Sequence, residues 1–427
     1  MYLACHSYYS LRYGTIAPED LPRLAKTMGI ETLCMADINN TSEAFGFISA
    51  CKKEGVKPVC GIDFRAVDPE TKQQEFRYLA IAQNSEGWYE LCKHLTEHSV
   101  ALHNIPALAP DWKHCHVVYR KLVKPIEEFQ EHEWLGIRPG EVHALYSSPL
   151  RNFLHKLVVY APVTVQDEEH WRLHKLLRCI DRNIILGKLE PRDYAGQDEH
   201  LRHPDDLRKA FERYPQIVEN SERILASCEI EMKVGMENNR ISFTATIPED
   251  YKLLSKLAMQ GCRRRYGAQH ERALERVRKE LQVIHRLGFS SYFLITWDIV
   301  RYAQSAGYYH IGRGSGANSI VAFCLYITDV DPLELDLYFE RFINPHRSSP
   351  PDFDIDFSWN ERDDVTEYIF ERYGRQHTAL LATYNTFKGK SIIRELGKVF
   401  GLPKADIDTI VDEPLADAKH HAFAKHI

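Results

Sequence analysis

The chain has 427 residues, of which 44% are hydrophobic and 27% charged, and its formal net charge is −6. These fractions exclude disordered, collagen-like and low-complexity proteins, and the length predicts two or three domains. The overall charge gives no sign of a nucleic-acid partner, so any such site has to be a local basic patch.

The sequence carries no sign of export or of a membrane. No apolar run approaches the ~20 residues that a membrane helix needs, and the first residues lack the charged and apolar regions of a signal peptide. The ten cysteines contain no CxxC pair, so neither a zinc framework nor a small disulfide scaffold is indicated. We therefore expect a cytoplasmic protein with reduced cysteines and no membrane partner.

Short apolar runs alternate with amphipathic stretches in the first part of the chain. Strands are predicted at Tyr2–Cys5, Thr32–Ala36, Val56–Phe64, Arg77–Ala82 and Leu157–Val163, and helices at Pro18–Met28, Ser42–Lys53 and Glu168–Arg182. Repeated strand–helix units of this length indicate an α/β fold with a parallel sheet or barrel. The proline-containing segment 101–141 gives no ordered prediction.

A turn-rich stretch at 187–204 ends this pattern, and two helices are predicted within 205–228. A polar segment then leads to a helix from Asp250. The helical region 255–286 carries nine Lys and Arg against three Glu, in a chain whose overall charge is negative. Two interpretations stay open for this region: a solvated helix surface, or a basic strip that follows a phosphate backbone.

The first motif with chemical meaning is segment 352–357, in which carboxylates alternate with apolar residues. At the two-residue period of a strand, Asp352, Asp354 and Asp356 share one face, with neighbours about 6.6 Å apart. Such carboxylates repel one another unless a cation neutralises them, and Mg²⁺ prefers oxygen ligands. An exposed acidic strand is the alternative. A calcium loop is excluded because Phe357 stands where that loop needs glycine.

The second motif is the glycine segment 310–319, which leads into an apolar helix predicted at Ile320–Tyr326. Its glycines allow consecutive backbone N–H groups to face one phosphate, and the helix would add its N-terminal dipole. A structural turn and a dinucleotide-binding fingerprint are the alternatives. The candidate phosphate ligands are Gly312, Arg313, Gly314, Ser315, Gly316 and Ser319, with Arg341 and Arg347 as further cations.

The two motifs lie 40 residues apart, with arginines between them. A phosphate loop, metal-binding carboxylates and cations together indicate transfer of a nucleotidyl or phosphoryl group with two metal ions. We expect Asp352 and Asp354 to face one cleft that also contains the glycine segment.

Five segments carry a resemblance to a known family: Gly288–Ile295, Gly312–Gly316, Ile327–Leu333, Phe339–Pro345 and Pro351–Phe357. In sequence and order they resemble the palm motifs of the bacterial DNA polymerase III alpha subunits, the C-family replicative polymerases. Near the N-terminus, His6–Leu11 and Lys57–Gly61 resemble that family's polymerase-and-histidinol-phosphatase (PHP) domain. The resemblance therefore covers the whole chain.

The resemblance implies three regions: a PHP domain at 1–228 with a distorted (β/α)7 barrel, the first part of a mixed α/β, nucleotidyltransferase-like palm at 229–382, and the start of a thumb at 383–427. It implies template-directed DNA polymerisation in chromosomal replication, in which a primer 3′-hydroxyl attacks the α-phosphate of a deoxynucleotide with two Mg²⁺ ions. Asp352 and Asp354 match the catalytic, metal-binding aspartates, whereas Asp356 matches an Asp outside the metal-binding set.

The partners that the resemblance implies are primer-template DNA, deoxynucleoside triphosphates, a sliding clamp, a proofreading exonuclease and clamp-loader subunits. The family's third catalytic Asp would lie beyond Ile427, so we expect a truncated chain that is inactive alone. A PHP-type phosphoesterase, a dinucleotide-binding oxidoreductase and a non-catalytic interaction fragment are the alternative functions.

The expected metal site of the PHP domain is degenerate. His6 and Asp63 match positions of metal ligands, but Ala4 and Ile38 stand where two further ligands would be. Neither alanine nor isoleucine offers a lone pair to a metal. We therefore expect no three-metal centre and no embedded nuclease.

Overall fold

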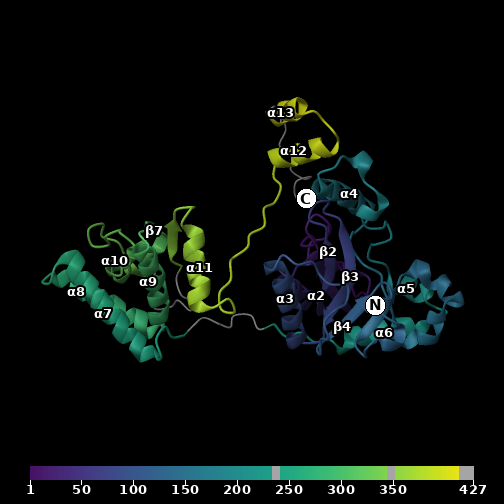
Figure 1. Cartoon of the computed structure of the whole chain (residues 1–427), viewed down its shortest axis with the longest axis horizontal. Coiled ribbons are helices and arrows are strands. Elements are labelled where there is room, and N and C mark those ends of the chain that lie inside the picture. The colour runs from purple at the N-terminus through teal and green to yellow at the C-terminus, as the bar shows by residue number, and fades with distance from the viewer. Residues whose placement is uncertain (233–240, 344–351, 413–427) are drawn as a thin grey trace. The chain divides into compact units, whose positions relative to one another are not determined.

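A computed structural model gives the fold of the chain and describes residues 1–232, 241–343 and 352–412. The chain forms two compact units, Met1–Val234 with Asn385–Ile427, and Gly235–Tyr384 (Figure 1). Within the described residues, no helix is both long enough and apolar enough to span a membrane.

The first unit is built on a six-stranded sheet whose strands follow one another in chain order (Figure 1). The strands are β1 (Thr32–Ile38), β2 (Lys57–Val67), β3 (Gln74–Ala82), β4 (Cys115–Tyr119), β5 (Glu133–Ile137) and β6 (Leu157–Val159). Strand β3 is antiparallel to both of its neighbours, whereas the other pairs are parallel. The mixed α/β class is confirmed, but the expectation of a parallel sheet is wrong at β3. The short connection between β2 and β3 allows only an antiparallel pair.

Residues 2–5 form no regular strand, although the sequence predicted one. Cys5 instead makes isolated parallel bridges to Met35 of β1 and to Val163, which follows β6. The backbone N–H of His6 donates to the carbonyl of Val163 at 2.8 Å, and that of Ala36 donates to the carbonyl of Cys5 at 2.8 Å. The N-terminal residues are therefore held between the first strand and the segment after the last strand.

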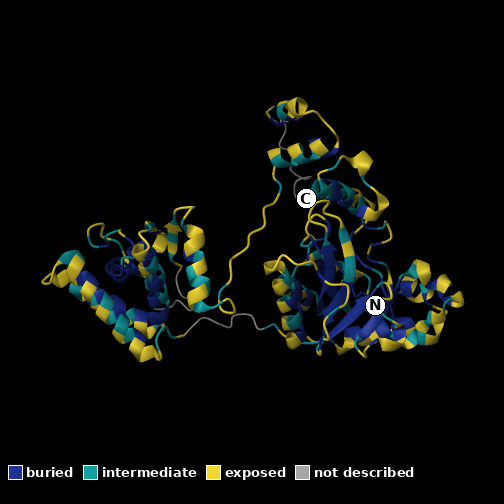
Figure 2. Ribbon diagram, viewed as in Figure 1, coloured by how far each residue is buried: buried dark blue, intermediate teal, exposed yellow. Residues whose placement is uncertain are grey.

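The helices of the first unit pack on its sheet or on other helices. They are α1 (Asp20–Thr27), α2 (Ala44–Glu54), α3 (Ser85–Val100), α4 (Glu168–Arg182), α5 (Pro204–Ala210), α6 (Pro215–Ser227), α12 (Lys390–Val399) and α13 (Lys404–Asp412). Helices α2 and α3 pack on β2 and β3, α6 packs on β6, and α12 lies against α4. The strands are buried along most of their length (Figure 2).

The alternation of side chains along β2 divides the core of the first unit. Ile62 and Phe64 lie in the cluster that includes Phe47 of α2, whereas Val59 lies in the cluster that includes Ile224 of α6. Because successive side chains point to opposite faces of a strand, Asp63 lies on the face of Val59. This position buries a carboxylate completely.

The second unit is a helical layer with a small sheet. Its elements are α7 (Ile247–Tyr266), α8 (Glu271–Arg286), α9 (Ser290–Ser305), α10 (Ile320–Cys324), α11 (Arg362–Tyr373), β7 (His310–Arg313), β8 (Asp354–Phe357), and the 3-10 helices η6 (Gly314–Asn318) and η7 (Phe339–Arg341). Helix α7 packs against α8, α9 and α10, and α9 packs against α11. Strands β7 and β8 form an antiparallel pair.

Candidate functional site

The β7–β8 pair brings the glycine segment and the aspartates side by side. In the register of this pair, Arg313 lies opposite Asp354 and Ile311 lies opposite Asp356. Gly314 follows β7 directly with a φ of +74°, a conformation that favours glycine. A Cβ atom on Gly314 would lie 2.5 Å from Oδ2 of Asp354, so the backbone of the glycine segment runs directly against this carboxylate.

The alternation predicted for segment 352–357 is present in the structure. Asp352, Asp354 and Asp356 are exposed, and the residues between them are partly buried. Phe353 anchors the segment, because its ring lies 5.0 to 5.4 Å from the rings of Tyr292, Phe293 and Phe342. Anchoring of the apolar side fixes the face on which the carboxylates stand.

One guanidinium group bridges the carboxylates of β8. Nε of Arg313 donates to Oδ2 of Asp356 at 2.6 Å, and Nη1 lies 3.9 Å from Oδ2 of Asp354. The hydrogen bond that Arg313 donates to Asp356 and the negative charges of Asp356 and Asp354 raise the pKa of Arg313, so this cation keeps its charge. A divalent cation at these carboxylates would therefore compete with Arg313.

The helix after the glycine segment was expected to add its N-terminal dipole to a phosphate site, and the structure does not support this expectation. Helix α10 has only five residues, and its first turn is already bonded inside the unit. Ser319 is fully buried; its Oγ donates to Oε2 of Glu280 at 2.8 Å and accepts from the N–H of Ala322. The N–H of Val321 also donates to Glu280. Ser319 is thus a capping residue inside the core and is not available to a phosphate.

Gly312 and Gly316 are needed for close packing. A Cβ atom on Gly312 would overlap the carbonyl oxygen of Ile327, and one on Gly316 would lie 2.8 Å from the ring of Phe353. These two glycines therefore position the loop, while Gly314 lies next to the carboxylate.

Sequence reasoning missed the residues of α8 that hold the glycine segment. Burial raises the pKa of Glu280 to about 7, although the hydrogen bond from Ser319 and the charge of Arg276 oppose this shift. Arg276 donates to Oε1 of Glu280 at 3.1 Å and to the carbonyl oxygens of Asn318 and Leu337 at 3.0 and 2.6 Å. The only sequence signal was the spacing of four residues between Arg276 and Glu280, which is common on exposed helices.

Part of the positive charge of the basic region 255–286 is paired with carboxylates of the same unit. Arg265 pairs with Asp329 at 2.8 Å and Lys279 with Glu340 at 3.2 Å. Its exposed cations are Lys256, Arg263, Arg264, Arg272, Arg278, Lys279 and Arg286. Both interpretations of this region therefore stay open.

Two of the remaining predicted nucleotide ligands lie on η6 and η7, which contact each other. Ser315 is exposed within η6, and Arg341 is exposed at the end of η7. Arg347 lies outside the described residues. Asp352 lies two residues before β8, on the same face as Asp354.

In the first unit, His6 and Asp63 form a buried pair. Nε2 of His6 lies 3.0 Å from Oδ2 of Asp63, and both side chains are fully buried. Arg65 completes the group, because its Nε and Nη2 donate to the two oxygens of Asp63 at 3.0 and 2.7 Å. Burial alone would raise the pKa of Asp63, but the charge of Arg65 and the hydrogen bonds from His6 and Arg65 lower it to about 2. A guanidinium group thus neutralises this carboxylate.

The other side of His6 is also bonded within the chain. Nδ1 of His6 lies 2.9 Å from Oγ1 of Thr164, which donates to Glu199 at 2.9 Å, and Glu199 pairs with Arg138 at 2.7 Å. Ala4 and Ile38 are buried, as is Thr164. Among the residues that the structure describes, no group of three or more His, Cys, Asp or Glu is arranged to hold a metal ion.

Comparison with known proteins identifies both regions. Residues 3–132 match the family described as PHP domain, and residues 252–425 match the family described as Bacterial DNA polymerase III alpha NTPase domain. The resemblance drawn from the sequence motifs is thereby confirmed.

Curated relatives align with almost the whole chain. The DNA polymerase III subunit alpha of Bacillus subtilis is 28% identical, and the alignment covers 96% of this chain and 39% of the relative. The error-prone DNA polymerase of Symbiobacterium thermophilum is 29% identical, with 96% and 42% covered. The DNA polymerase III subunit alpha of Xylella fastidiosa strain 9a5c is 29% identical, with 96% and 39% covered. The chain spans about two fifths of the length of these relatives.

Proposed function

Because the chain carries a PHP domain and the NTPase domain of bacterial DNA polymerase III alpha, we propose that it takes part in template-directed DNA synthesis. The reaction would add deoxynucleotides to a primer 3′ end by nucleotidyl transfer. The observation that supports this most directly is the pairing of β7 with β8, in which Arg313 and Gly314 stand against Asp354.

The domain assignment is part of this proposal. Residues 1–228 would form the PHP domain with a distorted (β/α)7 barrel, and the bridges of Cys5 to both Met35 and Val163 support closure of its sheet. Residues 229–382 would form the first part of the palm, which contains the β7–β8 pair. The assignment of 383–427 to a thumb rests on the family resemblance, since Asn385–Ile427 group with the first unit.

Asp352 and Asp354 are the proposed catalytic carboxylates. Exposed carboxylate oxygens beside a phosphate-binding loop suit Mg²⁺, which commonly uses one or two carboxylates together with substrate phosphates. Two Mg²⁺ ions would stabilise the attacking and the leaving oxygen of the transfer. The backbone of Gly314, the hydroxyl of Ser315 and the guanidinium groups of Arg313, Arg341 and Arg347 would hold the triphosphate.

Arg313 would pair with the carboxylates of β8 before the substrate binds and with a phosphate group afterwards. In the structure it neutralises Asp356 and lies near Asp354. With a metal cation held at these carboxylates, Arg313 would no longer be needed to neutralise them, and its guanidinium group could donate to a phosphate oxygen. Primer-template DNA, a sliding clamp, a proofreading exonuclease and a clamp loader are the proposed macromolecular partners.

Mn²⁺ titration of the chain in the presence of a deoxynucleoside triphosphate, followed by electron paramagnetic resonance, tests this function. We expect saturable binding that Asp354→Asn weakens at least tenfold, because the carboxylate nearest to the glycine segment is lost. Asp363→Asn is the matched control, since Asp363 is an exposed carboxylate of the same unit that pairs with Arg362. Equal Mn²⁺ affinity in Asp354→Asn and the unmodified chain would overturn the assignment.

A further inference from the structure

Helix α8 holds two of the segments that the proposed function assigns to the triphosphate. The guanidinium group of Arg276 donates to the carbonyl oxygens of Asn318, at the end of η6, and of Leu337, just before η7, at 3.0 and 2.6 Å. Helix η6 carries Ser315, and η7 carries Arg341. One side chain therefore ties together the backbones of both segments, which also contact each other.

Glu280 completes this arrangement from the next turn of α8. Its Oε1 accepts from Nε of Arg276 at 3.1 Å, which orients the guanidinium group. Its Oε2 accepts from the hydroxyl of Ser319 at 2.8 Å and from the N–H of Val321 at 3.2 Å. The side chains of Arg276 and Glu280 are 19% and 1% exposed, so water competes little for these bonds. The pair thus fixes the C-terminal end of the glycine segment and the start of α10.

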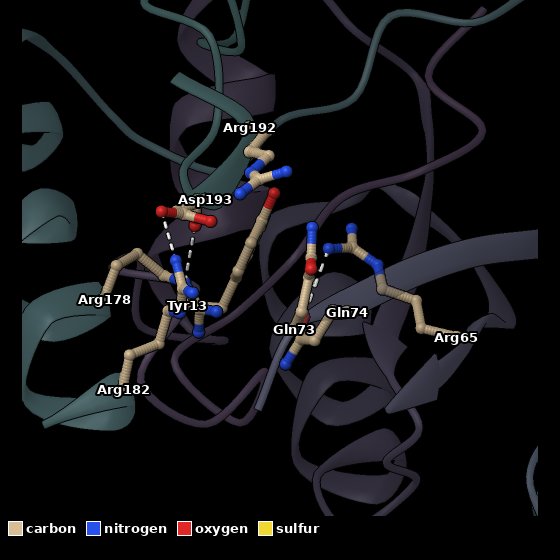
Figure 3. Close-up of a pocket in the computed structure, with 8 residues that line it drawn as sticks. All are labelled: Tyr13, Arg65, Gln73, Gln74, Arg178, Arg182, Arg192 and Asp193. Atoms are coloured by element: carbon tan, nitrogen blue, oxygen red, sulfur yellow. Dashed lines mark hydrogen bonds and ion pairs between the residues drawn. The ribbon is translucent and has the colours of Figure 1, made fainter. Parts of the chain in front are cut away.

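The arginines of the first unit have a different role. Four of them line the small pocket that Figure 3 shows. Each of the four pairs with a carboxylate: Arg65 with Asp63, Arg178 with Asp181, Arg182 with Asp193 and Arg192 with Glu190. Their positive charge is therefore balanced within their own unit. Arg276 also has a carboxylate partner, but its further donors reach the backbone of two segments with a proposed ligand.

The hydrogen bonds of Glu280 are those of an ionised carboxylate. Both of its oxygens accept from N–H or O–H groups, whereas a protonated carboxyl group donates from one oxygen. A proton on either oxygen would therefore face one of these donors and displace it. Burial opposes ionisation and raises the pKa of Glu280 to about 7, so both protonation states are populated near neutral pH.

The other charged or titratable groups packed around Glu280 keep their charge between pH 6 and pH 8. Arg276 stays protonated, as guanidinium groups do throughout proteins. From α7, Arg265 donates to the backbone of α10 and is a second permanent cation. On α10, burial raises the pKa of the Cys324 thiol, which stays neutral. On η7, a hydrogen bond from its own backbone lowers the pKa of Glu340, which stays ionised.

We propose that Arg276 and Glu280 are positioning residues for the triphosphate of the incoming nucleotide, and that the ionised form of Glu280 sets the binding arrangement of the glycine segment. Neither side chain touches the ligand. Arg276 holds η6 against η7, and Glu280 holds Ser319 at the end of the glycine segment. Protonation of Glu280 frees this end, so the affinity for a metal–nucleotide complex falls below neutral pH. This inference rests on the proposed function, because it concerns the same site.

Titration of the full chain with Mn²⁺ and a deoxynucleoside triphosphate at pH 6 and pH 8, followed by electron paramagnetic resonance, tests the proposal. Comparing variants at the same pH cancels the protonation of the nucleotide itself. At pH 8 we expect Glu280→Gln to bind about fivefold more weakly than the unmodified chain, since an amide resembles the protonated carboxyl group. At pH 6 we expect the two affinities to agree within about twofold. Glu275→Gln, at an exposed position of the same helix, is the control and should match the unmodified chain at both pH values.

Arg276→Lys tests the other member of the pair. Lysine keeps the positive charge but replaces the planar fork of donors by a single ammonium group, which fits this geometry poorly. We expect the affinity to fall about fivefold at both pH values. Arg272→Lys is the control, because Arg272 lies on α8 and pairs with Asp336 at the exposed surface.

Hydrogen exchange of the amides of residues 314–322 needs no nucleotide and so separates this proposal from the proposed function. We expect their protection to be lower at pH 6 than at pH 8 in the unmodified chain, and equal at both pH values in Glu280→Gln. If this pattern appears in a chain that binds no Mn²⁺–nucleotide complex, the proposed function fails while the pH-dependent positioning stands. Equal affinities of Glu280→Gln and the unmodified chain at pH 8, or exchange that does not depend on Glu280, would overturn the positioning role.

Discussion

Arginine stands against carboxylates in both units, with different consequences. Asp63 and Arg65 are buried, so their ion pair is a permanent part of the core. Arg313, Asp354 and Asp356 are each at least half exposed, so their pairing is weak and a stronger cation can replace it. The sequence predicted the aspartates and the missing ligands at Ala4 and Ile38. It did not predict the role of Arg65, because Asp-x-Arg on a strand is equally compatible with an exposed pair.

Glu280 gives the second unit a dependence on pH. Its pKa is about 7 in the folded chain and 4.5 is its ordinary value, so between these values the folded state binds more protons than the unfolded state. Its contribution to stability therefore falls as the pH rises from about 4.5 to 7. We expect Glu280→Gln to remove up to about 3 kcal/mol of this change, from a shift worth ~1.4 kcal/mol per pKa unit.

Urea unfolding at pH 5 and pH 7.5 measures this effect as the difference between Glu280→Gln and the unmodified chain. Glu275→Gln is the control, because Glu275 lies on the same helix and is exposed. A difference between Glu280→Gln and the unmodified chain that is the same at both pH values would show that Glu280 does not titrate in this range.

Helices and strands with a clear local sequence pattern were predicted at or near their observed positions. Helix α4 occupies the predicted range Glu168–Arg182, and β1, β2 and β3 begin within three residues of their predicted starts. Strands β4 and β5 were not predicted, because prolines interrupt segment 101–141. The two buried strands, Cys115–Tyr119 and Glu133–Ile137, are also short, with five residues each. The pairing of β7 with β8 could not be derived from a local pattern, because about 40 residues separate the two strands and only tertiary packing brings them together.

Helix α11 follows β8 and is anchored on α9 through one buried carboxylate. Oδ2 of Asp298 accepts hydrogen bonds from Tyr368 at 2.9 Å, Tyr373 at 3.0 Å and Arg372 at 3.2 Å, and Oδ1 accepts from Arg301. The Asp298 side chain is 1% exposed. We expect Asp298→Asn to destabilise the second unit by about 2–4 kcal/mol, because an amide group then faces donors that need an acceptor.

Hydrogen exchange of the α11 amides measures this anchoring, and we expect faster exchange in Asp298→Asn. Glu367→Gln is the control, since Glu367 lies on α11 and pairs with Arg375 at the exposed surface. Equal exchange rates in the two variants would mean that Asp298 does not hold the helix in place.

At the scale of the whole chain, the two units differ in how their charges are balanced. In the first unit the histidine, carboxylate and hydroxyl groups around His6 satisfy one another through Arg65, Thr164, Glu199 and Arg138. In the second unit the carboxylates of Asp354 and Asp356 on β8 stand at the surface, where they lie near the exposed side chain of Arg313. Metal dependence is therefore expected of the second unit and not of the stability of the first.

This contrast leads to a prediction about metal removal. A structural metal contributes its binding free energy to folding, so its removal lowers the melting temperature. Because Arg65 already neutralises Asp63, we expect less than one Zn²⁺, Mn²⁺ or Fe ion per purified chain and a change of the melting temperature below about 1 °C on chelation. Elemental analysis and thermal unfolding with and without chelator measure both quantities. His6→Gln serves as the comparison, because a metal held by His6 would be lost in that variant. Two or three tightly held metal ions in the unmodified chain, absent from His6→Gln, would show that the guanidinium group of Arg65 is displaced by metal and that the first unit retains a working metal site.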